Sequence, residues 1–156
     1  MVGEHTLAGY HIDKAISLNP NEFGIMAAAT EVKAYLGDYE AAIKWGKRAA
    51  LSDPYSADSF RESFLDAYYI GGQYELALEQ MIGWQDHGPY MYLQVAAAFA
   101  QLDRMEEARN SVQQFEINRP EGWNMKEVVR THVRMCAKPE DGERWMEGFR
   151  KAGVDI

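Results

Sequence analysis

The feature that most constrains this sequence is an internal repeat with a nearly constant period. Each copy begins with a glycine, continues through an alanine and ends with a proline, in the stretches Gly3 to Pro20, Gly37 to Pro54 and Gly72 to Pro89. The first two stretches start 34 residues apart, and the step from Ala42 to Ala77 is 35 residues. A fourth copy runs from Asp103 to Pro120. Such self-similarity predicts units that cannot bury their apolar faces alone and must stack on their neighbours.

The spacing of apolar residues predicts that these units are helical. Apolar residues recur at the i, i+3, i+4 and i+7 positions of one helix face, as in Leu93, Ala96, Ala97 and Ala100. No stretch shows the alternation of β-branched and polar residues that a strand requires. We therefore predict an all-α fold with helices at about residues 4–18, 22–36, 39–51, 56–70, 74–85, 89–102, 105–118, 121–136 and 140–152.

Small residues in these helices and glycines between them have predictable roles. Ala42, Ala77 and Ala108 recur at the same place in successive units, where a small side chain lets a neighbouring helix approach closely. The turn glycines are expected to adopt a positive φ where the first helix of a unit ends.

The period and its recurring residues resemble the tetratricopeptide repeat, a helix-turn-helix unit of about 34 residues. The fourth copy matches that family well in its first helix, with Tyr92, Val95, Ala96 and Phe99 at the large, small and aromatic positions. The second copy departs from the pattern at Lys33. The resemblance covers residues 3–136 and implies a right-handed α-solenoid of about three and a half repeats, followed by a capping helix.

The resemblance divides residues 1–156, taken as one domain, into units. These are a half repeat with only a second helix at 1–20, repeats at 21–54, 55–88 and 89–120, an extra helix at 121–136 and a capping helix at 139–156. The half repeat is expected to leave an apolar face that another element must cover. We therefore expect that the chain is a fragment of a longer protein. The alternative is that a partner or a second copy of the chain covers this face. The cap is expected to pack Trp145, Met146 and Phe149 over the preceding helix and its neighbours.

The segment from Glu143 to Val154 resembles the last helix of tetratricopeptide regions at the C-terminus of bacterial adenylate or guanylate cyclases and of some transcriptional regulators. This resemblance implies a second hypothesis for the whole chain. It would be a self-association or regulatory tail of a larger signalling protein, and a homodimer is one assembly that this hypothesis allows.

Composition excludes several classes of partner. A formal charge of -8, from 24 acidic and 16 basic residues, argues against binding to nucleic acid or to an anionic membrane. No apolar run is long enough to span a membrane, and the N-terminus lacks the pattern of a secretory signal. Together with a single cysteine, Cys136, these features predict a cytoplasmic protein.

Motifs that would indicate catalysis are absent from the sequence. The histidines His5, His11, His87 and His132 fall in different units, without a second ligand at a metal-binding spacing. No phosphate-binding glycine loop or activated nucleophile is recognisable. We therefore expect neither an enzyme, nor a cofactor, nor a metal site.

The concave side of the solenoid is where the resemblance places binding. The family's peptide-contacting positions, transferred to this chain, give these groove candidates: Glu31, Tyr35, Glu62, Asp66, Tyr69, Tyr90, Leu93, Gln101, Glu127 and Arg134. Acidic residues replace the basic clamp by which chaperone-binding relatives hold a carboxylate, so that clamp is not expected. The sequence predicts a non-catalytic protein-interaction module that binds a basic or aromatic peptide. Alternatively, the tyrosines Tyr35, Tyr69 and Tyr90 only pack between neighbouring helices.

Overall fold

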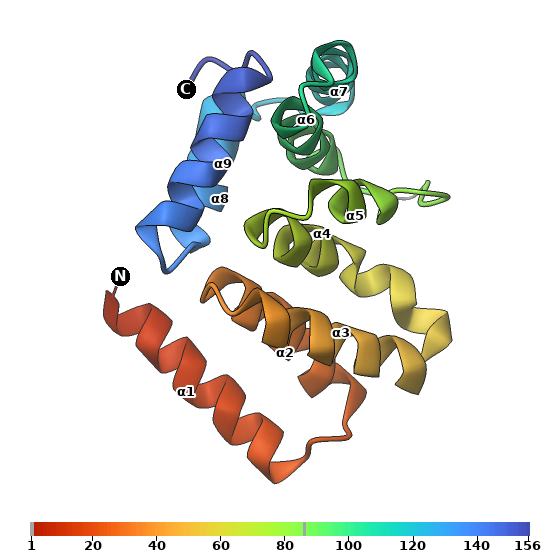
Figure 1. Cartoon of the computed structure of the whole chain (residues 1–156), viewed down its shortest axis with the longest axis vertical. Coiled ribbons are helices and arrows are strands. Elements are labelled where there is room, and N and C mark those ends of the chain that lie inside the picture. The colour runs from red at the N-terminus through yellow and green to blue at the C-terminus, as the bar shows by residue number, and fades with distance from the viewer. Residues whose placement is uncertain (1, 86) are drawn as a thin grey trace.

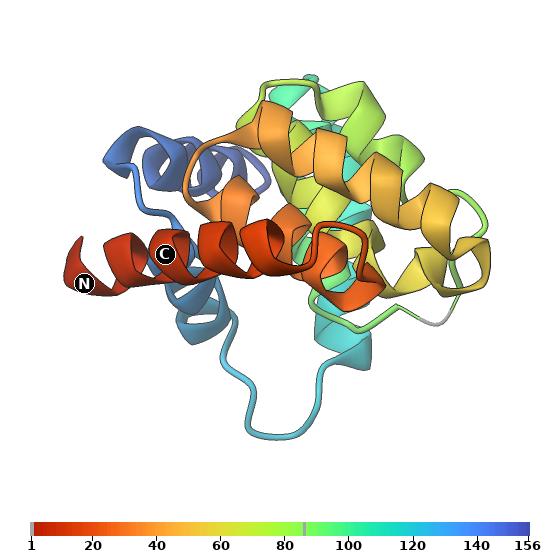
Figure 2. The same cartoon turned by 90° about the horizontal axis from the view of Figure 1, so that it is seen from below.

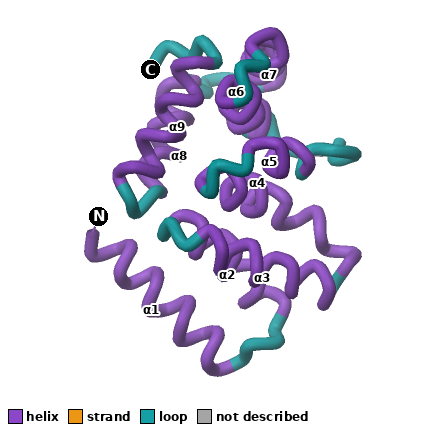
Figure 3. Tube along the Cα trace, in the orientation of Figure 1, coloured by secondary structure: helices purple, strands orange, loops and turns teal. Residues whose placement is uncertain are grey.

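The computed structural model describes residues 2–85 and 87–156, and every regular element in this part of the chain is helical (Figures 1 and 3). The all-α prediction is thus confirmed. The elements are α1 (Val2–Leu18), α2 (Phe23–Tyr35), α3 (Tyr39–Ser52), the 3₁₀-helix η1 (Pro54–Phe60), α4 (Arg61–Ile70), α5 (Tyr74–Glu79), α6 (Met91–Gln101), α7 (Met105–Asn118), α8 (Met125–Met135) and α9 (Pro139–Lys151).

Helices that follow one another in the chain pack together from α1 to α7. The closest pairs are α2 with α3 and α6 with α7, while α4 packs against α2, α3 and α5. These helices follow an arc in Figure 1, from α1 at the bottom to α6 and α7 at the top. The last two helices turn back to the inner side of this arc, where α9 packs along α6 and α8 packs against α9. The loop between α7 and α8 projects away from the helices (Figure 2).

The turns between paired helices have the predicted backbone conformation. Gly37 ends the α2 turn with a φ of 76°, and Gly72 ends the α4 turn with a φ of 72°. In the fourth copy the corresponding turn residue is Asp103, with a φ of 57°. A Cβ at Gly37 would lie 2.5 Å from the side chain of Lys138, which would have to move. The expectation of positive φ at these turns is confirmed.

Three predicted helix boundaries are wrong. The segment predicted as one helix at 56–70 is η1 followed by α4, since Asp53 caps a 3₁₀ turn that begins at Pro54. The helix predicted at 74–85 ends at Glu79, and the turn that follows includes a left-handed Gly83. The helix predicted at 121–136 begins only at Met125, because Gly122 has a φ of 84°.

The recurring alanines lie at helix crossings, as expected. Ala42, Ala77 and Ala108 are all fully buried. Ala42 of α3 forms a small cluster with Ala34 of α2 and Ala67 of α4, so three helices meet at side chains of one carbon. The corresponding residue of the first copy, Ala8 on α1, is exposed.

Helix α9 is fixed by its apolar face. Trp145 and Phe149 are fully buried, whereas Met146 is only partly buried. Trp145 stacks on Tyr69 of α4, with ring centroids 3.5 Å apart and an interplanar angle of 10°. Gly148 allows α9 to approach both α4 and α6. A Cβ at this position would clash with the Tyr69 hydroxyl of α4 and would lie 3.0 Å from the Cβ of Ala97 on α6. The cap packs against α6, against the preceding helix α8 and, more weakly, against α4, in agreement with the expected packing over the preceding helix and its neighbours.

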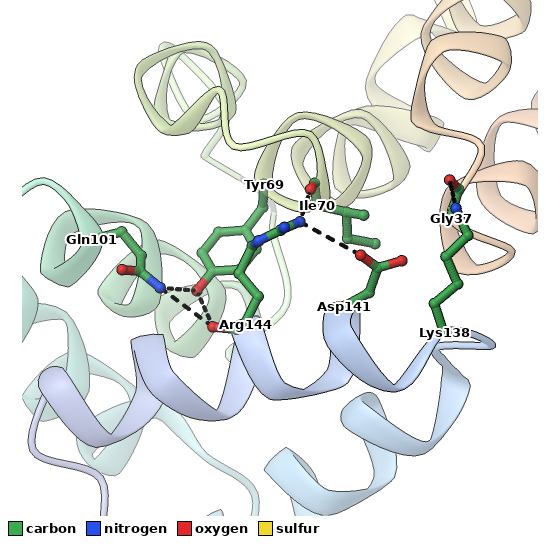
Figure 4. Close-up of polar contacts among 7 residues, drawn as sticks. All are labelled: Gly37, Tyr69, Ile70, Gln101, Lys138, Asp141 and Arg144. Carbon is green, nitrogen blue, oxygen red and sulfur yellow. Dashed lines mark hydrogen bonds and ion pairs between the residues drawn. The ribbon is translucent and has the colours of Figure 1, made fainter.

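Polar contacts hold the start and the middle of α9 against the arc (Figure 4). At its start, the Nζ atom of Lys138 donates to the carbonyl of Gly37 at 2.7 Å. In its middle, the Tyr69 hydroxyl donates to the carbonyl of Arg144 at 3.0 Å, and the Arg144 guanidinium donates to the carbonyl of Ile70. Carbonyl groups at the ends of α2 and α4 thus find donors on α9.

The alanine crossings generate a prediction with an internal control. The change Ala42→Leu should lower the free energy of unfolding by about 1–3 kcal/mol, because the larger side chain cannot fit between α2, α3 and α4 without displacing them. The same change at the exposed Ala8 should be nearly neutral. Urea unfolding followed by circular dichroism measures both variants, and equal losses at the two positions would contradict the assigned crossing.

Candidate functional site

The largest described cavity lies on the inner side of the arc, between α2, α4 and α8. Its volume is about 600 Å³, within the range of pockets that hold a small ligand or a side chain. It also reaches Tyr90, just before α6, and the loop that precedes α8. The lining residues are Glu31, Tyr35, Glu62, Ser63, Asp66, Tyr90, Gly122, Trp123, Asn124, Glu127, Val128, Thr131, His132 and Met135.

Helix α8 forms one wall of the cavity because of its own sequence. The Asn124 side chain caps its first turn by accepting a hydrogen bond from the amide of Glu127 at 3.2 Å. Val129 and His132, three residues apart, are buried on one face of the helix. The residues beside this face, Val128, Thr131 and Met135, turn toward the cavity.

The mouth of the cavity is acidic. Glu31 of α2 and Glu62 of α4 are exposed there. Partial withdrawal from water, and then the negative charge of Glu31, raise the pKa of the Glu62 carboxyl. Among the described residues no basic side chain forms an ion pair with either of these carboxylates.

The floor of the cavity holds a buried carboxyl group. Asp66 accepts a hydrogen bond from the Tyr35 hydroxyl at 2.5 Å and another from the Gln94 amide at 2.7 Å. Burial raises the pKa of Asp66 well above its usual range, and the nearby charge of Glu62 raises it further, although both hydrogen bonds oppose this shift. Burial first, and then the charge of Asp66, also raise the pKa values of Tyr35 and Tyr90.

His132 lies beside Asp66 on the floor and is uncharged at neutral pH. Only 3% of it is exposed, and burial lowers its pKa to about 3. Its ring meets the Trp145 ring edge-on, with centroids 4.6 Å apart. Its Nε2 atom is 3.8 Å from an Asp66 oxygen, too far for a hydrogen bond, and has no partner among the described atoms. The hydroxyl of Tyr90 is likewise buried without a partner.

Acidic side chains therefore outnumber basic ones in the lining of this cavity. The described residues that line it include Glu31, Glu62, Asp66 and Glu127, but neither lysine nor arginine. Aromatic and thioether side chains stand at the rim, where Trp123 is 38% and Met135 is 39% exposed. Acidic groups beside an aromatic surface are suited to an organic cation.

The structure brings together most of the groove residues suggested by the sequence. Glu31, Tyr35, Glu62, Asp66, Tyr90 and Glu127 all line the cavity.

Four groove candidates lie elsewhere. Tyr69 and Leu93 are fully buried, since Tyr69 packs on Trp145 and Leu93 belongs to the main core. Gln101 contacts α9, where its amide donates to the carbonyl of Arg144 at 3.3 Å. Arg134 lines a separate hollow beside α1. These four residues therefore do not line the cavity, and their placement in the groove is corrected.

His132 and Trp123 are among the lining residues that do not belong to the predicted groove set. The sequence suggests His132 only as a possible metal ligand. Its position three residues after the apolar Val129, on the same helix face, is the signal that it is buried. Trp123 lies in a segment that was predicted to be helical, so its position at the rim could not be anticipated.

No model of a protein family matches this chain, and no curated protein resembles it significantly in sequence. Within residues 2–85 and 87–156, no helix combines the length and apolarity needed to cross a membrane. The described side chains also include no group of three or more His, Cys, Asp or Glu residues placed to hold a metal ion.

The buried carboxyl generates a prediction about pH. Because the folded pKa of Asp66 is raised above the unfolded value of 3.8, the folded chain retains a proton that the unfolded chain loses. The contribution of Asp66 to the free energy of unfolding therefore falls as the pH rises from about 4 through the raised pKa, by up to about 1.4 kcal/mol per pH unit. Asp66→Asn keeps an acceptor for Tyr35 but carries no titrating proton, so it should gain stability relative to the native chain as pH rises.

Urea unfolding between pH 4 and pH 8 measures this difference. The contribution of His132 to stability has the opposite dependence and is lost as the pH falls below about 6.5, so the part of the range above this pH reports on Asp66. The exposed Asp155→Asn change is the control and should leave the pH profile of the native chain unaltered. A stability difference between Asp66→Asn and the native chain that does not vary with pH would contradict the assignment.

Proposed function

We propose that this chain is a non-catalytic protein-interaction module of the tetratricopeptide type, which binds a basic segment of a partner protein on the inner side of its helices. The observation that carries this proposal is the cavity in which Glu31, Glu62 and Asp66 meet an aromatic rim without a basic side chain. A basic partner would neutralise these charges and place apolar or ring surface against Trp123 and Met135.

The repeat part of the proposal is supported by features that recur at the repeat period. Positive φ angles at Gly37, Gly72 and Asp103 mark the end of the first helix in successive units. Buried alanines mark the crossings in the second helices, at Ala42, Ala77 and Ala108. Paired helices that stack on the next pair are typical of such arrays, whose inner surface commonly binds an extended segment.

The charge of the whole chain supports a basic partner as well. A formal charge of -8 attracts a cationic segment before contact and increases the rate of association. The mouth is open to solvent at Glu31, Glu62 and Glu127, so a peptide can enter without unfolding α8.

A second candidate function, self-association, rests on α1. Leu7, Tyr10 and Leu18 are 55%, 63% and 72% exposed, and their spacing places them on one face of that helix. Burial of this face against a second copy would suit the regulatory tail of a larger signalling protein, such as a nucleotide cyclase or a transcriptional regulator.

Fluorescence anisotropy with labelled ten-residue peptides tests the main proposal. A peptide rich in arginine and tyrosine should bind at least about tenfold more tightly than the same peptide with citrulline in place of arginine. Its affinity should fall as salt rises from about 0.05 to 0.5 M, because solvent-exposed charges are screened. Equal binding of an acidic peptide of the same length, or no binding at all, would contradict the proposal.

Light scattering over the same protein concentrations tests the second candidate function, self-association. A constant monomer mass would exclude it.

A further inference from the structure

The acidic cavity contains a feature that general charge attraction does not explain: polar atoms at its floor without partners. We propose that the cavity is a pocket for one guanidinium group, held between the Glu31 and Glu62 carboxylates at the mouth and directed toward Tyr90 and His132 at the floor. The inference rests on the proposed function and names the side chain that the ligand must present. The group can come from an arginine of a bound protein segment or from a free guanidine compound.

The hydrogen bonds at the floor determine which ring nitrogen of His132 is a donor and which is an acceptor. The Tyr35 hydroxyl donates its proton to Asp66 at 2.5 Å, so toward the Nδ1 atom of His132, 3.5 Å away, its oxygen can only accept. The proton of the neutral imidazole is therefore assigned to Nδ1. Nε2 is left as an acceptor with no donor among the described residues.

Acceptors consequently outnumber donors around this space. Among the described residues, the Nε2 atom of His132 and the Tyr90 hydroxyl have no hydrogen-bond partner, and no basic side chain is paired with the Glu31 or Glu62 carboxylate. Buried polar atoms without partners are unfavourable, and a ligand rich in N–H groups would satisfy them. The titratable groups that face the cavity are Glu31 and Tyr35 of α2, Glu62 and Asp66 of α4, Tyr90 before α6, and Glu127 and His132 of α8.

A guanidinium fits this arrangement better than an ammonium does. It presents five N–H donors in a planar fork, and it stays charged when it is withdrawn from water, whereas a lysine in such a site tends to lose its proton. Its flat face can stack on an aromatic ring, which the exposed Trp123 provides at the rim. Two carboxylates on neighbouring helices match the two edges of the fork.

Calorimetric titration of the full chain with Nα-acetyl-arginine methylamide tests this inference. The native chain should bind this probe, bind the lysine analogue about fivefold more weakly, and show no heat with the citrulline analogue, which has the same shape but no charge. Glu62→Gln should weaken binding of the arginine probe by about tenfold or more. The matched control is Glu106→Gln, an exposed residue on α7, which changes the net charge equally and should leave the affinity unchanged.

A second variant separates binding from folding. Tyr90→Phe removes a buried hydroxyl that has no partner, so the free chain should melt at the same or a higher temperature. The same variant should bind the arginine probe several-fold more weakly. A purely structural tyrosine would not produce opposite effects on stability and affinity.

Butylguanidine and an arginine-containing peptide distinguish the two possible sources of the guanidinium group. If the group belongs to a protein segment, the peptide should bind at least about tenfold more tightly than butylguanidine. Equal affinities would indicate a free guanidine compound.

Citrulline that binds as well as arginine, or Glu62→Gln that binds as well as the native chain, would overturn the inference. If basic peptides still bind in either case, the docking function stands and only the guanidinium pocket is wrong. If neither peptides nor probes bind, the proposed function fails together with the inference.

Discussion

The Trp145 ring of α9 lies flat against the Tyr69 ring of α4, and the position of the last two helices depends on this contact. Both residues are fully buried, and the short distance between their rings is possible because Gly148 leaves room for the Tyr69 hydroxyl. Aromatic side chains of this size bury a large apolar surface. The contact therefore draws α9 to the inner side of the arc and not to its outer end.

The cavity is a consequence of that closure. When α9 lies against α6, α8 is held opposite α2 and α4, and His132 is buried between Trp145 and Tyr35. The carboxyl of Asp66 then loses contact with water, and Tyr35 and Gln94 become its hydrogen-bond partners. Burial raises the pKa of Asp66 and lowers that of His132, because withdrawal from water disfavours the charged form of each group. The exposed carboxylates, Glu31 and Glu62, lie at the mouth, where a ligand arrives.

The parts of the fold that could be predicted are those that repeat. A glycine or aspartate at the end of a helix and an alanine at a crossing have local causes, so their recurrence at about 34 residues predicts turns and contacts directly. The acidic side chains of the groove were predictable for the same reason, because Glu31, Glu62 and Asp66 occupy corresponding faces of successive helices.

The parts that could not be predicted depend on contacts between distant segments. The early end of α5 involves Arg61, whose guanidinium donates to the carbonyls of Gln80 and Ile82 at 3.0 Å. Nothing within residues 74–85 reveals that partner. In the same way, the burial of Tyr69 and Leu93 depends on where α9 comes to rest, and the sequence of α9 shows only that it has an apolar face. The place of α8 in the cavity follows from the same long-range closure.

Nuclear Overhauser effects between aromatic protons test this closure most directly. In a uniformly labelled sample, the Trp145 indole protons should show strong cross-peaks to the Tyr69 ring, whose centroid lies 3.5 Å away. Cross-peaks should also link His132 to Tyr35, whose ring centroids lie 5.7 Å apart. Their presence would place α8 and α9 on the inner side of the arc and enclose the cavity. Cross-peaks from Trp145 to α7 alone, with none to Tyr69, would show that the helices continue outward and that the cavity does not form.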